Sequence, residues 1–170
     1  MNYKAPAWKP TEKSGVALEV LGQVAFGPNS TIYRKLVLQE RKVQGLFPSF
    51  GLSRDPYLVS VQTMVNKSEE VPAVEAEILA VIKRFQETPI DVKQLADTKS
   101  ALKYGLLMGM ETAQDVAFAV MQSIVSTGRL EPLEDYFRTL DAVTPDDVRD
   151  AARKYLVDTG RTTITMVQGD

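Results

Sequence analysis

Apolar residues in the first part of the chain recur at helical spacing, and one break divides them into two helices. In Lys13–Gly27 the apolar positions form the stripe of one helix face, and Pro28 ends it. Ser30 or Asn29 then stands where a helix N-cap is expected, because short polar side chains accept hydrogen bonds from free backbone N–H groups. The pattern therefore predicts two consecutive helices before residue 42.

The next two segments change to the period of a β-strand. Tyr57–Val65 alternates between two faces, which predicts a strand with one covered side. Lys42–Leu52 is also strand-like, but Pro48 has no N–H to donate to a central ladder, so this strand is expected at a sheet edge. A turn over residues 53–56 would join the two strands into an antiparallel hairpin.

From residue 71 the period is helical again, with short breaks between the helices. The expected helices are 71–88, one beginning after Asp91, Glu111–Thr127, Leu130–Leu140 and one capped by Thr144, followed by a β-branched strand at Arg161–Val167. This order predicts an α+β fold. It would be a two-layer sandwich, with a mainly antiparallel sheet and helices packed on one face. Residues 1–12, which hold prolines and the single tryptophan, are expected as an extended arm or linker leading into one domain over 13–170.

Two features of the helical region have competing interpretations. A bulky apolar set is expected in the ordinary core, although it could instead face a partner domain; its members are Leu106, Leu107, Met108 and Met110. Gly105 costs roughly 1 kcal/mol inside a helix, so we expect close helix packing or a helix break there.

Composition limits the chemistry available to the chain. It has no histidine and no cysteine, so it cannot build an ordinary zinc, copper or iron site alone, and it lacks a cysteine nucleophile. The net charge is −2 and no basic stripe is present, which argues against nucleic-acid binding. No stretch approaches the length of a membrane span.

An ordered series of segments resembles a known family. The early segments are Ala17–Leu21, Asn29–Val37, Gly45–Phe50 and Arg54–Pro56, and a helix around Leu95–Leu107 follows them. The matching positions near the end are Tyr136, Leu140, Val143, Thr144, Pro145, Asp147, Val148, Ala151, Lys154, Tyr155 and Leu156. Together they resemble the second-half, non-zinc domains of insulinase/pitrilysin-type zinc metallopeptidases, the group that includes mitochondrial processing peptidase.

The resemblance implies a domain that works beside a zinc-bearing half. In this family two similar halves enclose a chamber, and the first half holds zinc through an inverted H-x-x-E-H helix whose glutamate activates water. Many second halves carry an arginine and a later tyrosine that hold substrate. Those positions fall on Val37 and Gln44, so the pair is expected to be absent. No catalytic, cofactor or metal residue is expected here, and zinc is expected on the missing half or a partner.

Four residues remain as candidate substrate or interface contacts. Arg34 would stand at the chamber wall or a domain interface, or else be an ordinary solvated side chain. Gln44 could donate to a peptide carbonyl. Leu46 and Phe47 belong to the irregular strand, whose edge could accept a peptide strand by β-augmentation or could simply be protected by Pro48.

The resemblance leads to two hypotheses of function. The first is a non-catalytic C-terminal domain of a zinc protease that closes the chamber and docks on the zinc-bearing half, inactive alone, with peptide-bond hydrolysis as the parent reaction. The second is a structural or interaction subunit of the same fold without peptidase activity. Expected partners are the zinc-bearing half, in the same polypeptide or another subunit, a peptide substrate, and a second copy in a homodimer. Bacterial relatives are often envelope proteins, so the resemblance suggests the cell envelope or periplasm.

Overall fold

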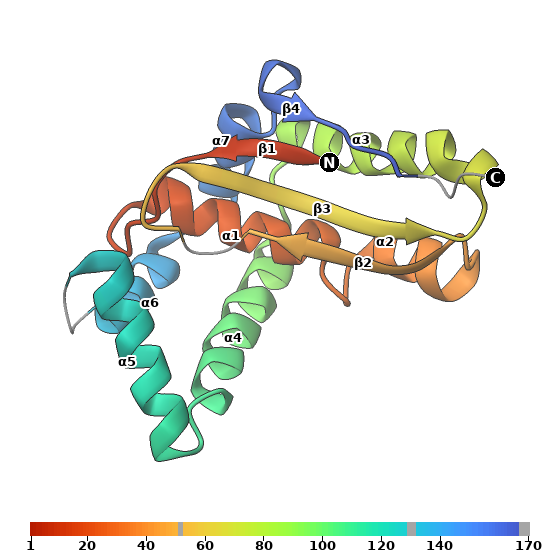
Figure 1. The fold of residues 1–170 in the computed structure, drawn as a ribbon. Helices are drawn as coiled ribbons and strands as arrows, with labels where there is room; N and C mark the ends of the chain where they lie inside the picture. Colours follow the sequence, from red (N-terminus) through yellow and green to blue (C-terminus); the bar gives the residue numbers. More distant parts are fainter. Residues whose placement is uncertain (51–52, 129–131, 167–170) are drawn as a thin grey trace.

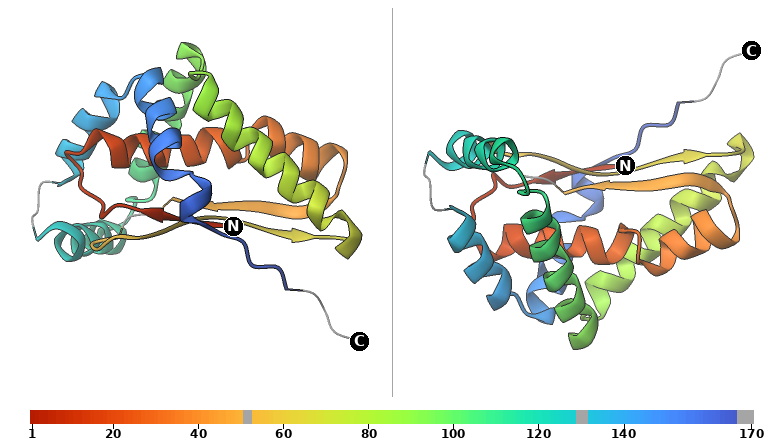
Figure 2. Two further views of the ribbon diagram at one scale, coloured as in Figure 1. Left: turned by 90° about the horizontal axis from the view of Figure 1, so that it is seen from above. Right: turned by 90° about the horizontal axis from the view of Figure 1, so that it is seen from below.

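A four-stranded antiparallel sheet forms one layer of the molecule, and helices cover one of its faces (Figures 1 and 2). The computed structural model describes residues 1–50, 53–128 and 132–166. The strands are β1 (Asn2–Ala5), β2 (Val43–Ser49), β3 (Tyr57–Val65) and β4 (Arg161–Thr162), in the order β2-β3-β1-β4. This arrangement confirms the predicted α+β two-layer fold.

The helices account for most of the described chain. They are α1 (Lys13–Phe26), α2 (Thr31–Tyr33), α3 (Val71–Glu87), α4 (Val92–Met108), α5 (Ala113–Thr127), α6 (Pro132–Ala142) and α7 (Pro145–Tyr155). The single-turn elements are the π-helical η1 (Arg34–Gln39) and the 3-10 turns η2 (Ser68–Glu70) and η3 (Asp158–Gly160). No described helix is both long and apolar enough to cross a membrane.

The strand pairing separates a buried face of the sheet from an open one. In β3, Val59 and Val61 are buried beneath the helices. Gln62, the next residue along the strand, points to the other face and is exposed. Phe47 of β2 pairs with Gln62, so it lies on the open face as well. Because side chains alternate along a strand, the helices cover only the face of Val59 and Val61.

Helix α1 is the centre of the core. Most of its residues are buried, and it packs against β2, α4, α6 and α7. A Cβ built on Gly22 would lie 2.4 Å from Cγ of Phe50, so this helix approaches the end of the β2 segment more closely than any larger residue permits. The ring of Phe50 also stacks on Phe26, with centroids 6.3 Å apart.

The helix predicted after Ser30 forms, but its second half is a π-helix, which is wound more loosely than an α-helix. Ser30 caps it as predicted, since its hydroxyl accepts the N–H of Tyr33 at 3.1 Å. From Arg34 the backbone then continues as the π-helix η1, in which the N–H of Glu40 donates to the carbonyl of Lys35 at 2.8 Å. Arg41, with φ of 51°, turns the chain into β2. π-Helical turns have no simple sequence signature, so periodicity did not predict this one.

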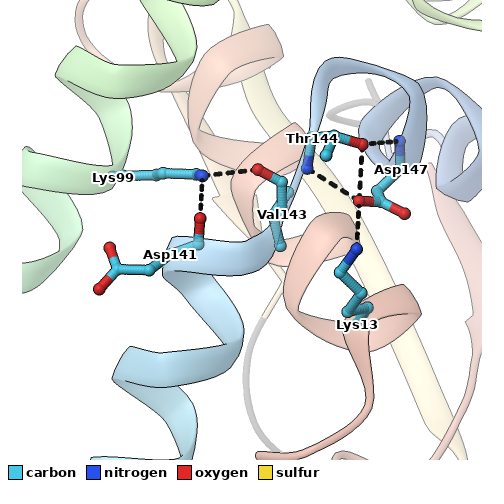
Figure 3. Close-up of polar contacts among 6 residues, drawn as sticks. All are labelled: Lys13, Lys99, Asp141, Val143, Thr144 and Asp147. Atoms are coloured by element: carbon cyan, nitrogen blue, oxygen red, sulfur yellow. Dashed lines mark hydrogen bonds and ion pairs between the residues drawn. The ribbon is translucent and has the colours of Figure 1, made fainter.

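A network at the α6–α7 junction joins four helices (Figure 3). Thr144 and Asp147 form the capping box of α7, and Asp147 also accepts a hydrogen bond from Lys13 of α1 at 2.9 Å. The ammonium group of Lys99 on α4 donates to the carbonyls of Asp141 and Val143, at 2.9 and 2.5 Å. The predicted cap at Thr144 is therefore confirmed. Its partner Asp147 joins α7 to α1, and Lys99 joins the end of α6 to α4.

Both ends of the described chain differ in detail from the sequence expectation. The sequence predicts that residues 2–5 belong to an extended arm. They are extended, but they form β1 within the sheet, between β3 and β4. The final strand is only Arg161–Thr162, shorter than the expected Arg161–Val167. Of the expected limits, Leu52, Leu130 and Val167 lie outside the described residues.

The expectation that the apolar set at the end of α4 lies in the ordinary core is wrong. The helices form as predicted, but Leu106, Leu107 and Met108 are 38, 51 and 64% exposed. No residue of α5, all of which the structure describes, is buried. Gly105 has nothing within 4 Å of a built Cβ, so no neighbouring helix presses on it. In Figure 1 the two helices project away from the sheet as a pair, which explains why their apolar residues stay uncovered.

Candidate functional site

A cleft of about 1060 Å³ lies between α1, α4, α5 and α6. Its walls are largely apolar, with Leu102 and Leu106 from α4 and Val120 from α5. Polar groups lie at its α1 and α6 walls, among them Glu19 and Tyr136. A concave, mostly apolar space with a few convergent polar groups is the usual form of a binding site in proteins.

Three residues of this cleft form a polar cluster. The rings of Trp8 and Tyr136 lie with their centroids 6.1 Å apart. The Tyr136 hydroxyl makes a hydrogen bond with the Glu19 carboxyl group, and burial raises the pKa of Glu19 to about 7. Burial also raises the pKa of Tyr136. The carboxyl group therefore exchanges its proton near neutral pH, while the phenol stays protonated.

Two atoms of this cluster have no hydrogen-bond partner. Among the described residues, Oε2 of Glu19 and Nε1 of Trp8 are the buried side-chain polar atoms without one. Such atoms are costly in a folded protein unless water or another molecule pairs with them. Both belong to residues that line the cleft, although the two atoms themselves are buried.

Sequence reasoning did not select this cluster. Glu19 is the single charged residue between Lys13 and Phe26, and Trp8 is the single tryptophan of the chain. A lone carboxylate in an otherwise uncharged part of the helix was the available signal. Its significance depends on Tyr136, which is more than a hundred residues away in sequence and reaches Glu19 only through the packing of α6 on α1.

The second surface of interest is the open face of the sheet around β2. Phe47 is 61% exposed, and its ring lies over the backbone of Gly45, because a Cβ on Gly45 would be 2.6 Å from the ring atom Cζ. Met64 of β3 is also exposed on this face. The pairing of β2 with β3 shifts between Val43 and Leu46, which marks a bulge in the edge strand.

The four residues selected from the sequence lie in different places. Gln44 and Phe47 are exposed on β2, the edge strand of the described sheet. Leu46 is 4% exposed and packs in the core, on the face opposite to Phe47. Arg34 lines the cleft between the helices. The structure therefore brings Gln44 and Phe47 onto one strand but does not gather all four residues into one site.

The comparison with family models agrees with this architecture. The model of the peptidase M16 inactive domain matches residues 1–102 of the chain. The chain belongs to the peptidase M16 inactive-domain family. The resemblance to non-zinc domains of insulinase-type metallopeptidases, based on segments such as Ala17–Leu21, is thereby confirmed.

Curated relatives of this inactive domain are longer proteins. The alpha subunit of mitochondrial-processing peptidase from Solanum tuberosum is 22% identical over 166 residues, with 91% of the chain and 33% of the relative covered. Zinc protease PqqE from Helicobacter pylori is 28% identical over 166 residues, with 96 and 36% covered. The chain thus spans about a third of the length of the curated relatives it matches.

Solved structures share the fold of this inactive domain. A protease from Helicobacter pylori superposes with a TM-score of 0.80 at 24% identity, covering 94% of this chain and 38% of that one. An inactive peptidase domain from Bordetella parapertussis gives a TM-score of 0.74 at 18% identity, covering 95 and 86%. Structures of this similarity establish the two-layer fold.

Zinc is the metal of the parent family, and the residues of this inactive domain do not fit a zinc site. The chain has no imidazole or thiolate donor. Within the described ranges, no three acidic side chains converge so that they could hold a metal ion. Zinc in proteins is bound by nitrogen and sulfur donors, with carboxylates as additional ligands. No step of a metal-dependent reaction is therefore assigned to this chain.

Proposed function

We propose that the chain is the non-catalytic C-terminal domain of a zinc protease, in which it closes the substrate chamber and docks on the zinc-bearing half. The parent reaction would be hydrolysis of a peptide bond. The observation that carries the proposal is the open face of a sheet in a family defined as peptidase-inactive. Helices cover the other face, so the open face is the side of the sheet available to line a chamber.

The edge strand β2 supports contact with an extended peptide. It lies at the outside of the described sheet, so one side of its backbone is not paired with a described strand. Gln44 and Phe47 are exposed beside that edge. Peptides often bind to sheet edges through main-chain hydrogen bonds, with side chains of the host selecting the sequence. Phe47 would supply apolar contact and Gln44 a hydrogen bond.

A second function is a structural or interaction subunit that has the fold but no role in peptide hydrolysis. The observation favouring it is that Val37 and Gln44 stand where many members of the family carry the arginine and tyrosine that hold substrate. Val37 packs against the core, so it offers no charged group to a peptide. One relative, the alpha subunit of mitochondrial-processing peptidase, is named as a subunit of a larger enzyme.

The first experiment combines this chain with the zinc-bearing polypeptide of its source. That polypeptide is recognised by H-x-x-E-H in the same gene or in a neighbouring one. We expect zinc-dependent cleavage of a peptide mixture only when both parts are present, and no cleavage by this chain alone. Equal cleavage by the zinc-bearing polypeptide alone would rule out the chamber role and favour the structural subunit.

Variants on β2 test the contact residues. Phe47→Ala removes the proposed aromatic contact with the peptide. In the combined protein, kcat/KM for peptide cleavage should therefore fall about tenfold, equivalent to about 1.4 kcal/mol. Val92→Ala is the matched control, because Val92 is 71% exposed on a helix and not on the sheet. A selective loss with Phe47→Ala supports peptide contact at β2. Equal activity of the two variants contradicts it.

A further inference from the structure

The outer side of the α4–α5 pair carries an uncovered apolar stripe. We name it the ridge, and its residues are Leu107, Phe118, Met121 and Val125. Their exposed fractions range from 45% at Met121 to 61% at Val125. Phe118, Met121 and Val125 recur at i, i+3 and i+7, so they share one face of α5. A helix that is apolar on all sides is normally buried by another element.

The inner side of the same helix pair forms the mouth of the cleft. Ala101 and Gly105 of α4 face Val120 and Ser123 of α5 across it, and all four line the cleft. On α5 these positions lie on the opposite side of the helix from the ridge. One helix pair therefore presents both a protruding apolar surface and an apolar hollow, which is what a self-complementary contact requires.

Charge does not oppose contact between identical surfaces here. Between Tyr104 and Thr127 the charged residues are Glu111 and Asp115, both near the connection between the helices. Homodimer interfaces are more apolar than transient heteromeric ones, and charged residues are depleted from interface centres. A nearly uncharged ridge therefore fits a second copy better than a partner that would be attracted by charge.

The exposed area is sufficient for a stable dimer. Besides the four ridge residues, six others on the same two helices are each more than a third exposed, namely Tyr104, Leu106, Met108, Val116, Val120 and Ile124. Ten large side chains in this state offer an area on the order of the 800 Å² per partner buried in a standard interface.

The geometry points to a symmetric homodimer in which the ridge of each copy seats in the cleft of the other. The four helices α4 and α5 of the two copies would pack around the two-fold axis, as in a helical bundle. This inference concerns a different surface from β2 and does not rest on the proposed protease role. It assigns the α4–α5 pair an occupant, a second copy of this chain.

The test is the oligomeric state of the purified chain by sedimentation equilibrium between about 1 and 200 µM, a range that brackets micromolar affinity. We expect wild-type protein to dimerise. Phe118→Glu places a charge in the ridge, and Ala101→Trp fills the cleft; each should weaken dimerisation at least tenfold. Phe47→Glu is the matched control, since Phe47 is as exposed as the ridge but lies on the sheet, and it should leave the dimer intact.

A cross-linking experiment gives a readout that does not depend on variant stability. Because the chain has no cysteine, Met121→Cys and Gly105→Cys each create a single thiol. Mixed under mild oxidation, the two variants should form the heterodimeric disulfide in preference to either homodimer, and Phe47→Cys should not cross-link.

Three outcomes overturn the inference. Wild-type protein that stays monomeric over the whole range shows that a second copy does not cover this surface, even if a zinc-bearing partner does. A dimer broken by Phe47→Glu but not by Phe118→Glu uses the sheet instead. A dimer sensitive to Phe118→Glu but unaffected by Ala101→Trp places ridge against ridge, not ridge in cleft.

Discussion

Two glycines in helices differ in how closely they are packed, and this difference determines how replacement by alanine changes the stability of the protein. Gly22 of α1 meets the base of the Phe50 side chain, with a built Cβ only 2.4 Å from Cγ and 2.9 Å from Cβ of that residue. Gly105 of α4 meets nothing within 4 Å. Both positions pay the same entropic penalty for glycine in a helix, so packing alone separates them.

Gly22→Ala should therefore destabilise the protein by about 1–2 kcal/mol, because overpacking outweighs the gain in helix propensity. Gly105→Ala should stabilise it by up to about 1 kcal/mol, through propensity alone. Urea denaturation of the two variants beside wild type measures both values. A stabilised Gly22→Ala protein would show that Phe50 moves away at little cost.

The buried carboxyl group of Glu19 makes stability depend on pH. Its pKa is about 7 in the folded chain and near 4.5 when unfolded, so between these values the folded state holds the extra proton. Stability from this group is greatest below pH 4.5, falls as pH rises to about 7, and is constant above. The full difference is at most about 3 kcal/mol.

Glu19→Gln should remove this part of the pH dependence and raise stability at pH 8. The amide keeps an oxygen that can accept the Tyr136 hydroxyl hydrogen bond. Denaturation at pH 5, 6, 7 and 8 measures the effect, and the chain has no histidine to titrate in that range. The difference between variant and wild type isolates Glu19 from the amino group of Met1, whose pKa burial lowers. Parallel pH curves for the two proteins would refute this assignment.

At the scale of elements, two helices begin with the same capping box but differ in how firmly they are held. Thr112 with Asp115 starts α5, and Thr144 with Asp147 starts α7. Helix α7 buries Val148, along with other residues, against α1 and α3. Because α5 buries no side chain, its cap stabilises mainly the helix itself.

Thr144→Ala should lower the global free energy of unfolding by about 1 kcal/mol, the usual value of an N-cap side chain. It also disturbs the geometry of Asp147, which Lys13 of α1 contacts. Thr112→Ala is the matched control and should change global stability by less than half as much. Equal losses would mean that α5 unfolds together with the core, contrary to its exposed packing.

Sequence periodicity located most elements, and its errors have a common physical origin. Tyr57–Val65 and the cap at Thr144 were predicted correctly, because strand alternation and N-capping are local. The burial of Leu106, Leu107 and Met108 on α4 was predicted wrongly, because a local apolar stripe shows that a helix needs a partner but not whether the same chain supplies it. The cleft cluster was missed because Glu19 and Tyr136 meet only in the tertiary structure.

At the scale of the whole molecule, stability is distributed unevenly between the well-packed core around α1 and the projecting α4–α5 pair. Helix α1 is buried along most of its length and contacts strands and helices on several sides, whereas α5 has its main contact with α6. Regions with few buried apolar contacts open locally at lower free energy than the core. Dilute protein should therefore open at α5 well before it unfolds globally.

Hydrogen exchange followed by mass spectrometry measures this order directly. In dilute protein the amides of Ala113–Thr127 should exchange first, at an opening free energy several kcal/mol below the global value, while those of Lys13–Phe26 exchange last. Raising the protein concentration should slow exchange in α5 and leave α1 unchanged, because association protects only what it covers. Phe118→Glu should remove the concentration dependence, and Phe47→Glu should retain it. Slow exchange of α5 in dilute wild-type protein would show that this helix is held within its own chain.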